Sequence, residues 1–219
     1  MSRSRIPRPL AMALTLAPAI LVIVAAATTL GASRSELSAE GSESSTAVAT
    51  FAGGCFWCME PPFDELDGVL STTSGYTGGP ERNPTYKQVA YGRTGHAEAV
   101  EVAYDPSVIT YAELLEVFWR NIDPTTADRQ FCDRGRHYRT AIYYHDDEQR
   151  RLAEETRDRI AASGVLDGPI VTEIEAAGEF WRAEEYHQDY YLKNPGPYKR
   201  YRIGCGRDRV LERIWGAGD

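Results

Sequence analysis

The chain has 219 residues, 24 of them basic and 32 acidic, which gives a formal net charge of −8 at pH 7. This acidic balance argues against nucleic acid or an anionic membrane surface as the main partner. The length is sufficient for an N-terminal leader and one domain with a substantial core, and no internal repeat interrupts that domain.

The first 32 residues have the pattern of an export signal. Residues 1–9 carry three arginines and no acid, and residues 10–32 form an apolar run that ends in small residues. The run is long enough to span a bilayer of about 30 Å, so a cleaved signal peptide and an N-terminal membrane anchor both remain open. We therefore expect an exported protein of the periplasm or cell envelope. Residues 33–45 are rich in Ser and Glu and predict a linker without structure, ahead of a domain at 46–216.

Helices and strands alternate along this domain. Alternating or continuous apolar residues predict strands at about 46–52, 68–77, 96–104, 138–144 and 170–176. Capping residues and apolar periodicity predict helices that start near 55, 83, 110, 147, 182 and 207. The interleaving predicts an α/β or α+β two-layer sandwich, and we expect a mixed sheet, a ferredoxin-like core and an irregular C-terminal tail.

The most informative segment is GGCFWCME at 53–60. The two glycines follow a predicted strand and allow a tight turn, which places Cys55 at the N-terminus of a helix. Unpaired amide groups and the helix dipole favour the thiolate there, so we expect a lowered pKa for Cys55. The alternative is a buried structural cysteine.

A second candidate is Glu98, which lies in the alternating strand at 96–104. It shares a face with Val100 and Val102, whereas Glu101 lies on the opposite face with small alanines. A carboxyl on an apolar face is desolvated, which raises its pKa and lets it serve as a general acid. The alternative is a solvated position at the start of the strand.

Taken together, these segments resemble the type A peptide-methionine sulfoxide reductases. The resemblance covers about residues 46–197 in collinear order. The matching motifs are GCFW at 54–57, GYTGG at 75–79, NPTY at 83–86, TGHAEA at 94–99, YDP at 104–106, FW at 118–119, DP at 123–124, YR at 138–139, EYHQ at 185–188 and NP at 194–195.

The resemblance implies reduction of the S epimer of methionine sulfoxide, free or in oxidised proteins, with a thioredoxin-like dithiol as reductant and no cofactor or metal. Taken alone, each aromatic residue of the implied site is better explained by packing in the core. The implied site residues are the nucleophile Cys55; Glu98, Tyr86 and Tyr138, which bind or protonate the sulfoxide oxygen; Phe56 and Trp57, which form a pocket for the S-methyl group; and Asp133, which lines the site near Tyr138.

The thiol that resolves an oxidised Cys55 is the open question, because the chain departs from the family around its other cysteines. We expect Cys205 to have this role, since it lies between two glycines in a tail with few apolar anchors and can move towards Cys55. Cys58, close in sequence, and Cys132 remain alternatives.

Two other functions remain possible for a chain with these cysteines. The first is a thioredoxin-like dithiol oxidoreductase that uses the C-x-x-C pair Cys55 and Cys58 on disulfide substrates. The second is a non-enzymatic envelope module held together by Cys55–Cys58 and Cys132–Cys205 disulfides.

Overall fold

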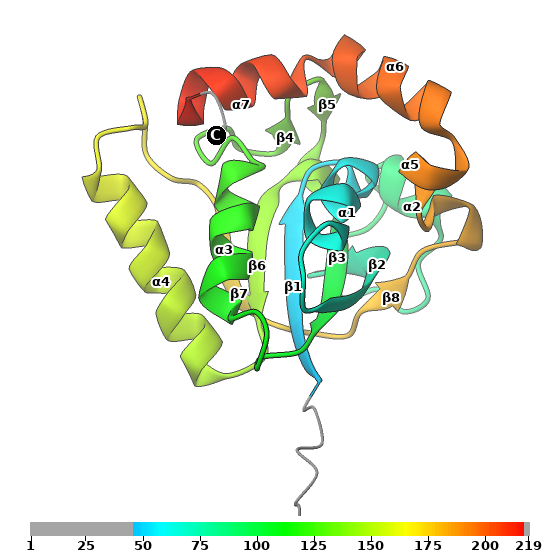
Figure 1. Cartoon of the computed structure of the whole chain (residues 1–219). Coiled ribbons are helices and arrows are strands. Elements are labelled where there is room, and N and C mark those ends of the chain that lie inside the picture. Colours follow the sequence, from blue (N-terminus) through cyan, green and yellow to red (C-terminus); the bar gives the residue numbers. More distant parts are fainter. Residues whose placement is uncertain (1–45, 217–219) are drawn as a thin grey trace, which may run out of the picture. The chain divides into compact units, whose positions relative to one another are not determined.

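The computed structural model describes residues 46–216, which form a six-stranded sheet with helices and a separate two-stranded hairpin (Figure 1). The predicted signal or anchor at 1–32 and the linker at 33–45 lie outside the described residues. Within the described part, no helix has the length and apolar character needed to cross a membrane. The strands are β1 (Ala47–Gly53), β2 (Val69–Thr77), β3 (Ala97–Tyr104), β6 (Thr140–Tyr144), β7 (Glu173–Ala176) and β8 (Trp181–Arg182), with β4 (Arg129–Gln130) and β5 (Asp133–Arg134) in the hairpin. The helices are α1 (Phe56–Asp64), α2 (Tyr86–Ala90), α3 (Tyr111–Arg120), α4 (Asp147–Ala162), α5 (Tyr190–Lys193), α6 (Pro195–Cys205) and α7 (Arg207–Trp215).

The order of the strands confirms the predicted mixed sheet and ferredoxin-like core. The sheet order is β7-β6-β1-β3-β2-β8, and all neighbours are antiparallel except β6 and β7. The segment β1-α1-β2-β3-α3-β6 therefore contains two βαβ halves whose four strands interleave in one sheet. Figure 1 shows α1 and α3 on one face of these strands.

The main core lies between this face and the helices. The Phe51 ring of β1 stacks 5.3 Å from Phe63 of α1 and 5.0 Å from Phe118 of α3, measured between centroids. Val100 and Val102 of β3 belong to the same buried cluster, whereas the alanines that alternate with them face a smaller cluster on the other side. The β3 alternation predicted from the sequence is thus confirmed, and it directs Glu98 towards the helical side.

The helix predicted from residue 182 is wrong. That segment instead adds the short strand β8 to the edge of β2, followed by a 3₁₀ turn at Glu185–His187 and the short helix α5. The Gln188 side chain explains the interruption, because it accepts the Ser74 N–H and donates to the Ser74 carbonyl, both at 2.9 Å. These bonds to the sheet compete with a continuous helix.

The prediction of an irregular C-terminal tail is also wrong, although the helix expected near 207 is confirmed as α7. Pro195 and Pro197 lie in the first turn of α6, where a missing N–H costs no intrahelical bond. Gly206 has φ +71° and separates α6 from α7. Figure 1 shows these two helices crossing the end of the sheet from which α1 starts, so the tail contributes to that end.

Candidate active site

The turn from β1 into α1 places Cys55 immediately before the first helical residue, as predicted. Gly53 has no room for a side chain, because a Cβ there would lie 2.6 Å from the Met59 Sδ atom. Gly54 has φ +86°, which glycine adopts without strain. Cys55 is the N-cap residue of α1, and its carbonyl accepts the Cys58 N–H at 3.0 Å. The two glycines therefore hold this thiol at the helix N-terminus, where only 5 % of the residue is exposed.

Cys55 and Cys58 are the free cysteines of the described residues, and their thiols hydrogen-bond each other. Burial raises the pKa of Cys55, and its interactions with Cys58 and Glu98 add to that rise. The hydrogen bond from Cys55 lowers the pKa of Cys58 to about 7, with help from the positive charges of Arg207 and Arg202. The lowered pKa predicted for Cys55 is therefore wrong in this structure, because burial raises the pKa of this thiol. The pair loses its first proton more readily from Cys58.

Glu98 is buried beside this pair, as predicted, with 1 % of the residue exposed. Its Oε2 atom accepts the N–H of Phe56, the first residue of α1, at 3.2 Å. Burial raises the pKa of the carboxyl to about 8, although the Phe56 N–H opposes the rise. At neutral pH the group is therefore mostly protonated and can donate a proton next to Cys55.

Tyr86 and Tyr138 bring two neutral hydroxyl groups to the same place. Burial is the main cause of a raised pKa for each phenol, and the charges of Glu98 and Cys55 raise both values further. Both hydroxyl groups therefore remain donors over the whole physiological pH range. The structure thus gathers Glu98, Tyr86 and Tyr138, the three residues proposed to bind or protonate the sulfoxide oxygen, around the thiol of Cys55.

Phe56 and Trp57 form an aromatic wall together with residues that the sequence did not single out for this role. Phe56 is buried, with its ring centroid 5.0 Å from that of His187. Trp57 stacks on Tyr190 at 3.8 Å, meets Tyr201 edge-on at 5.9 Å, and donates its Nε1–H to His187 Nδ1 at 3.0 Å. Burial lowers the pKa of His187 to about 4, so this ring is a neutral acceptor. The wall is suited to hold an apolar group beside Cys55.

Asp133 is linked to the site through the C-terminal tail. The Tyr201 hydroxyl of α6 lies 2.5 Å from Asp133 Oδ2 and also hydrogen-bonds the Cys55 thiol. Burial raises the pKa of Asp133, whereas the Tyr201 hydrogen bond and the charge of Arg207 oppose that rise. Tyr201 is therefore a site residue that sequence analysis missed. Its signal in the sequence was only its place one helical turn before Cys205.

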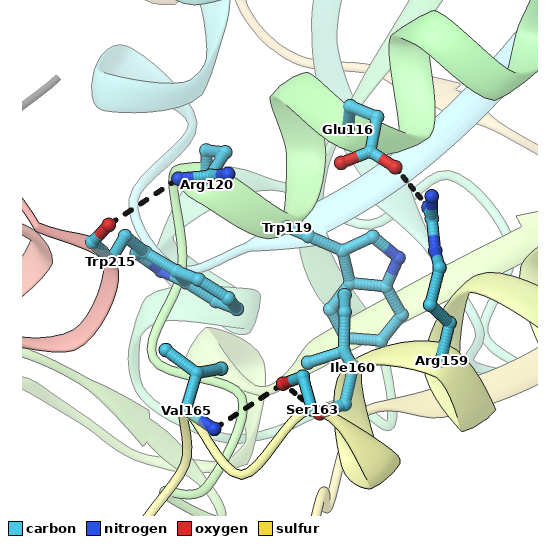
Figure 2. Close-up of a pocket in the computed structure, with 8 residues that line it drawn as sticks. All are labelled: Glu116, Trp119, Arg120, Arg159, Ile160, Ser163, Val165 and Trp215. Atoms are coloured by element: carbon cyan, nitrogen blue, oxygen red, sulfur yellow. Dashed lines mark hydrogen bonds and ion pairs between the residues drawn. The ribbon is translucent and has the colours of Figure 1, made fainter. Parts of the chain in front are cut away.

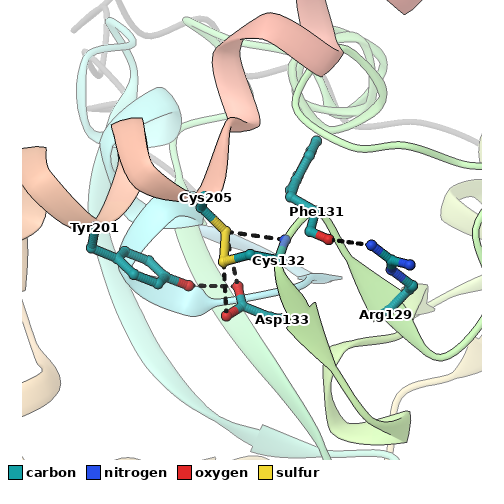
Figure 3. The surroundings of a disulfide bond; sticks show 6 residues. All are labelled: Arg129, Phe131, Cys132, Asp133, Tyr201 and Cys205. Carbon is teal, nitrogen blue, oxygen red and sulfur yellow. Dashed lines mark hydrogen bonds between the residues drawn. A yellow bond between two sulfur atoms is a disulfide. The ribbon is translucent and has the colours of Figure 1, made fainter.

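Cys132 and Cys205 form a disulfide that joins the segment before β5 to the end of α6 (Figure 3). Cys132 is exposed and Cys205 is half-buried. The Asp133 carboxylate lies between this disulfide and Tyr201, with Oδ1 3.6 Å from Cys132 Sγ and Oδ2 3.9 Å from Cys205 Sγ. The bond fastens α6 over the site, and it leaves Cys58 as the free thiol beside Cys55.

A pocket of about 290 Å³ lies elsewhere, between α3, α4 and the end of α7 (Figure 2). Its lining includes Trp119, Ile160 and Trp215, with an ion pair between Glu116 and Arg159 at the rim. None of the candidate site residues lines it. We therefore assign the chemistry to the Cys55 site.

Comparison with known proteins gives a consistent answer for this domain. The family model described as "Peptide methionine sulfoxide reductase" matches residues 47–218. A protein named "Peptide methionine sulfoxide reductase MsrA" from Bacillus licheniformis is 56 % identical over 169 residues, which cover 77 % of this chain and 93 % of that protein. The protein of the same name from Bacillus subtilis is 54 % identical over 170 residues, with coverage of 78 % and 96 %.

Solved structures show the same similarity. Methionine sulfoxide reductase A of Corynebacterium diphtheriae has a TM-score of 0.62 and 38 % identity, covering 71 % of this chain and 77 % of that one. The reduced form of Mxr1 from Saccharomyces cerevisiae has a TM-score of 0.63 and 37 % identity, covering 69 % and 87 %. Both matches extend the sequence similarity to the fold.

Proposed function

The chain belongs to the peptide methionine sulfoxide reductase family, and we propose from this premise that it reduces the S epimer of methionine sulfoxide, free or in proteins, to methionine. This reaction makes the protein an oxidoreductase, and its action on oxidised proteins is a repair of oxidative damage. The observation that carries the proposal is a buried carboxyl, hydrogen-bonded to the first turn of α1 beside a buried thiol pair, whose pKa is raised to about 8.

The first step needs a nucleophile and an acid on opposite sides of the sulfoxide. A sulfoxide sulfur is a poor electrophile until its oxygen is protonated or strongly hydrogen-bonded. In our proposal Glu98 gives a proton to that oxygen, while Tyr86 and Tyr138 donate hydrogen bonds to it. Cys55 passes its thiol proton to the hydrogen-bonded Cys58 thiolate as it attacks the sulfur, and the oxygen passes to Cys55 as a sulfenic acid while methionine leaves.

The substrate is oriented by apolar contact. We propose that Phe56 and Trp57 hold the S-methyl group and that Asp133 lines the site beside it. Tyr201 occupies the space between Asp133 and Cys55 in the present structure. Substrate entry therefore requires the Tyr201 side chain to move aside.

Recycling begins with the thiol nearest to the sulfenic acid. Cys58 is free and already hydrogen-bonds Cys55, so we propose that it forms the first disulfide and releases water. Cys205 as the resolving thiol stays a prediction, because its sulfur is bonded to Cys132 and has to be reduced before it can attack. A thioredoxin-like dithiol is the proposed reductant. The exposed sulfur of Cys132 offers such a protein a second point of attack, with Cys205 as the leaving thiolate.

The proposed location is the periplasm or cell envelope. It rests on the basic and apolar pattern of residues 1–32 alone. Expression of the full chain, followed by fractionation and N-terminal sequencing, separates a cleaved signal from a retained membrane anchor. Recovery of the intact chain in the cytoplasm would refute export.

The activity is tested with a peptide that contains methionine sulfoxide, with dithiothreitol as reductant and chromatography that separates the epimers. We expect the S epimer to disappear and the R epimer to remain. The alternative function, a thioredoxin-like dithiol oxidoreductase, is supported by the contact between the free Cys55 and Cys58 thiols. It would be indicated by rapid reduction of insulin disulfides without sulfoxide reduction.

A further inference from the structure

Arg207, the first residue of α7, is a buried cation without an ion-pair partner among the described residues. Only 1 % of the residue is exposed, although its neighbours Asp208 and Arg209 are exposed. No carboxylate of the described residues lies within ion-pair distance of its guanidinium, and its Nε–H has no hydrogen-bond partner there. Burying a charge is costly unless it is paired, so this arrangement requires an explanation.

The contacts of Arg207 fix the guanidinium behind the active-site turn. Its Nη2 atom lies 3.1 Å from the Gly53 carbonyl oxygen, 2.7 Å from the Asn121 carbonyl oxygen and 2.8 Å from Met59 Sδ. The Phe131 ring covers it, with the centroid 4.6 Å from Cζ. These partners are dipoles, a sulfur and a ring, so they orient the cation without neutralising it.

Arg202 on α6 offers a comparison within the same tail. Its guanidinium binds the Asp208 carboxylate at 2.6 Å, and 22 % of the Arg202 side chain is exposed to solvent. The charge of Arg202 is therefore already balanced. Arg207 differs from it in both respects, because no carboxylate of the described residues pairs with it and only 1 % of the residue is exposed.

The charge of Arg207 acts on two acidic groups, the Asp133 carboxyl and the Cys58 thiol. Asp133 already accepts a hydrogen bond from the Tyr201 hydroxyl, so the group left to balance Arg207 is the thiol of Cys58. Arg207 contacts Gly53 and Met59, which flank the thiol pair in the chain, and its positive charge helps to lower the pKa of Cys58. The other titratable and charged groups that act on this thiol are Cys55 on the same helix, Arg202 and Tyr198 on α6, Asp133 on β5 and Glu98 on β3. Arg207 and Arg202 are the cations that act on this thiol, and Arg202 is already paired with Asp208.

We propose that Arg207 is the positioning residue that holds the Cys58 thiolate as its counter-ion during recycling. The inference rests on the proposed function. The Cys58 thiolate attacks the sulfur of the Cys55 sulfenic acid, the S–S bond forms and the S–O bond breaks. The departing hydroxide takes up a proton equivalent to the one that Cys58 lost, so water is the second product. Cys58 sulfur is oxidised and Cys55 sulfur is reduced in this step.

The proposal is tested by titrating the Cys58 thiolate in the full-length protein. Cys55→Ser leaves Cys58 as the free thiol of the domain, because Cys132 and Cys205 are joined. Thiolate absorbance near 240 nm is then followed from pH 5 to 9. A second change, Arg207→Met, should raise the midpoint by about one unit and lower the thiolate fraction at pH 7 by ~5-fold.

Three controls separate charge from structure. Arg207→Lys keeps a cation and should restore most of the low midpoint, whereas Arg207→Gln should behave like Arg207→Met. Arg209→Met removes an exposed charge from the same helix and should leave the midpoint unchanged. Circular dichroism shows which variants fold. If Arg207→Lys folds and its midpoint equals that of Arg207→Gln or Arg207→Met, the counter-ion role is refuted.

The kinetic test uses the protein with Cys55 intact. After one equivalent of substrate, the rate at which the Cys58 thiol disappears should fall ~5-fold in Arg207→Met at pH 7 and recover at pH 9. A loss of equal size at both pH values would indicate a structural role and contradict the proposal. A wild-type protein that does not reduce the sulfoxide at all would refute the proposed function. The titration would still test whether Arg207 lowers the pKa of Cys58, because it needs no substrate.

Discussion

The domain holds two cysteine pairs that differ in redox state, burial and accessibility. Cys55 and Cys58 are reduced and buried at the start of α1, next to a neutral carboxyl. Cys132 and Cys205 are oxidised, and the bond between them lies at the surface, where α6 meets the segment before β5. The buried pair is suited to a reaction that excludes water, whereas the exposed pair is accessible to a second protein. Residue type alone therefore does not assign a role to a cysteine.

The largest effect should come from Cys55→Ser, which removes the thiol of the buried pair that attacks the substrate. A serine hydroxyl remains protonated at neutral pH and is a weak nucleophile, so turnover of the sulfoxide should fall to the background rate. The measurement is methionine formation with dithiothreitol as reductant. Cys132→Ser, which changes the exposed pair, is the matched control and should retain the first chemical step. Substantial turnover by Cys55→Ser would exclude this residue as the nucleophile.

Glu98→Gln should have the next largest effect, since the amide can donate a hydrogen bond but is a negligible acid. We expect a loss on the order of 10²–10⁴ in the single-turnover rate, the usual cost of losing a general acid. In the wild type, the same rate should fall as pH rises through about 8, where the carboxyl loses its proton. Glu101→Gln, on the opposite face of β3, is the control. Equal single-turnover rates for Glu98→Gln and wild type would show that Glu98 is not the general acid and serves only in packing.

The burial of Glu98 also predicts how stability depends on pH. The unfolded chain releases this proton near pH 4.3, whereas the folded protein retains it up to about 8. Between those values the folded state binds more protons, so the free energy of unfolding contributed by Glu98 is lost as pH rises. Relative to Glu98→Gln, the wild type should lose on the order of a few kcal/mol between pH 5 and 8. The measurement is urea unfolding of both proteins at pH 5 and pH 8. The raised pKa would be contradicted if the difference in the free energy of unfolding between wild type and Glu98→Gln were the same at both pH values.

The exposed pair should contribute mainly to stability and recycling. Cys132→Ser opens a disulfide that joins residues 73 apart in sequence, and we expect a loss of about 2–4 kcal/mol in the free energy of unfolding. It should also loosen α6 over the site. The first turnover should survive, and thioredoxin-dependent turnover should slow more than turnover with dithiothreitol. Unchanged kinetics with both reductants would mean that the bond is only structural.

The sequence was most informative where the pattern is local. The strand, the two glycines and the aromatic pair around Cys55 predicted the turn, and the period-two alternation of β3 predicted that Glu98 is buried. Capping boxes likewise placed α3 correctly. Each of these features depends on residues within one or two turns of the chain.

The C-terminal tail could not be predicted in the same way. Arg207 lies among basic residues that suggest a solvated surface, yet it is buried through contacts with Gly53, 154 residues earlier in the chain. Tyr201 reaches Asp133 across 68 residues. The raised pKa of Cys55 has a similar origin, because the helix N-terminus is local whereas the desolvation that overrides it comes from the assembled site.

The central claim is that the buried pair carries out both the attack and the first recycling step. Peptide mapping by mass spectrometry, after one equivalent of the S-sulfoxide and without reductant, tests it directly. We expect a new Cys55–Cys58 linkage, one equivalent of methionine, and an unchanged Cys132–Cys205 bond. In protein whose Cys132–Cys205 bond is first reduced and the reductant then removed, a Cys55–Cys205 linkage with Cys58 left as a thiol would instead assign the recycling step to the tail cysteine favoured by the sequence. Methionine formation without oxidation of Cys55 would contradict the account as a whole.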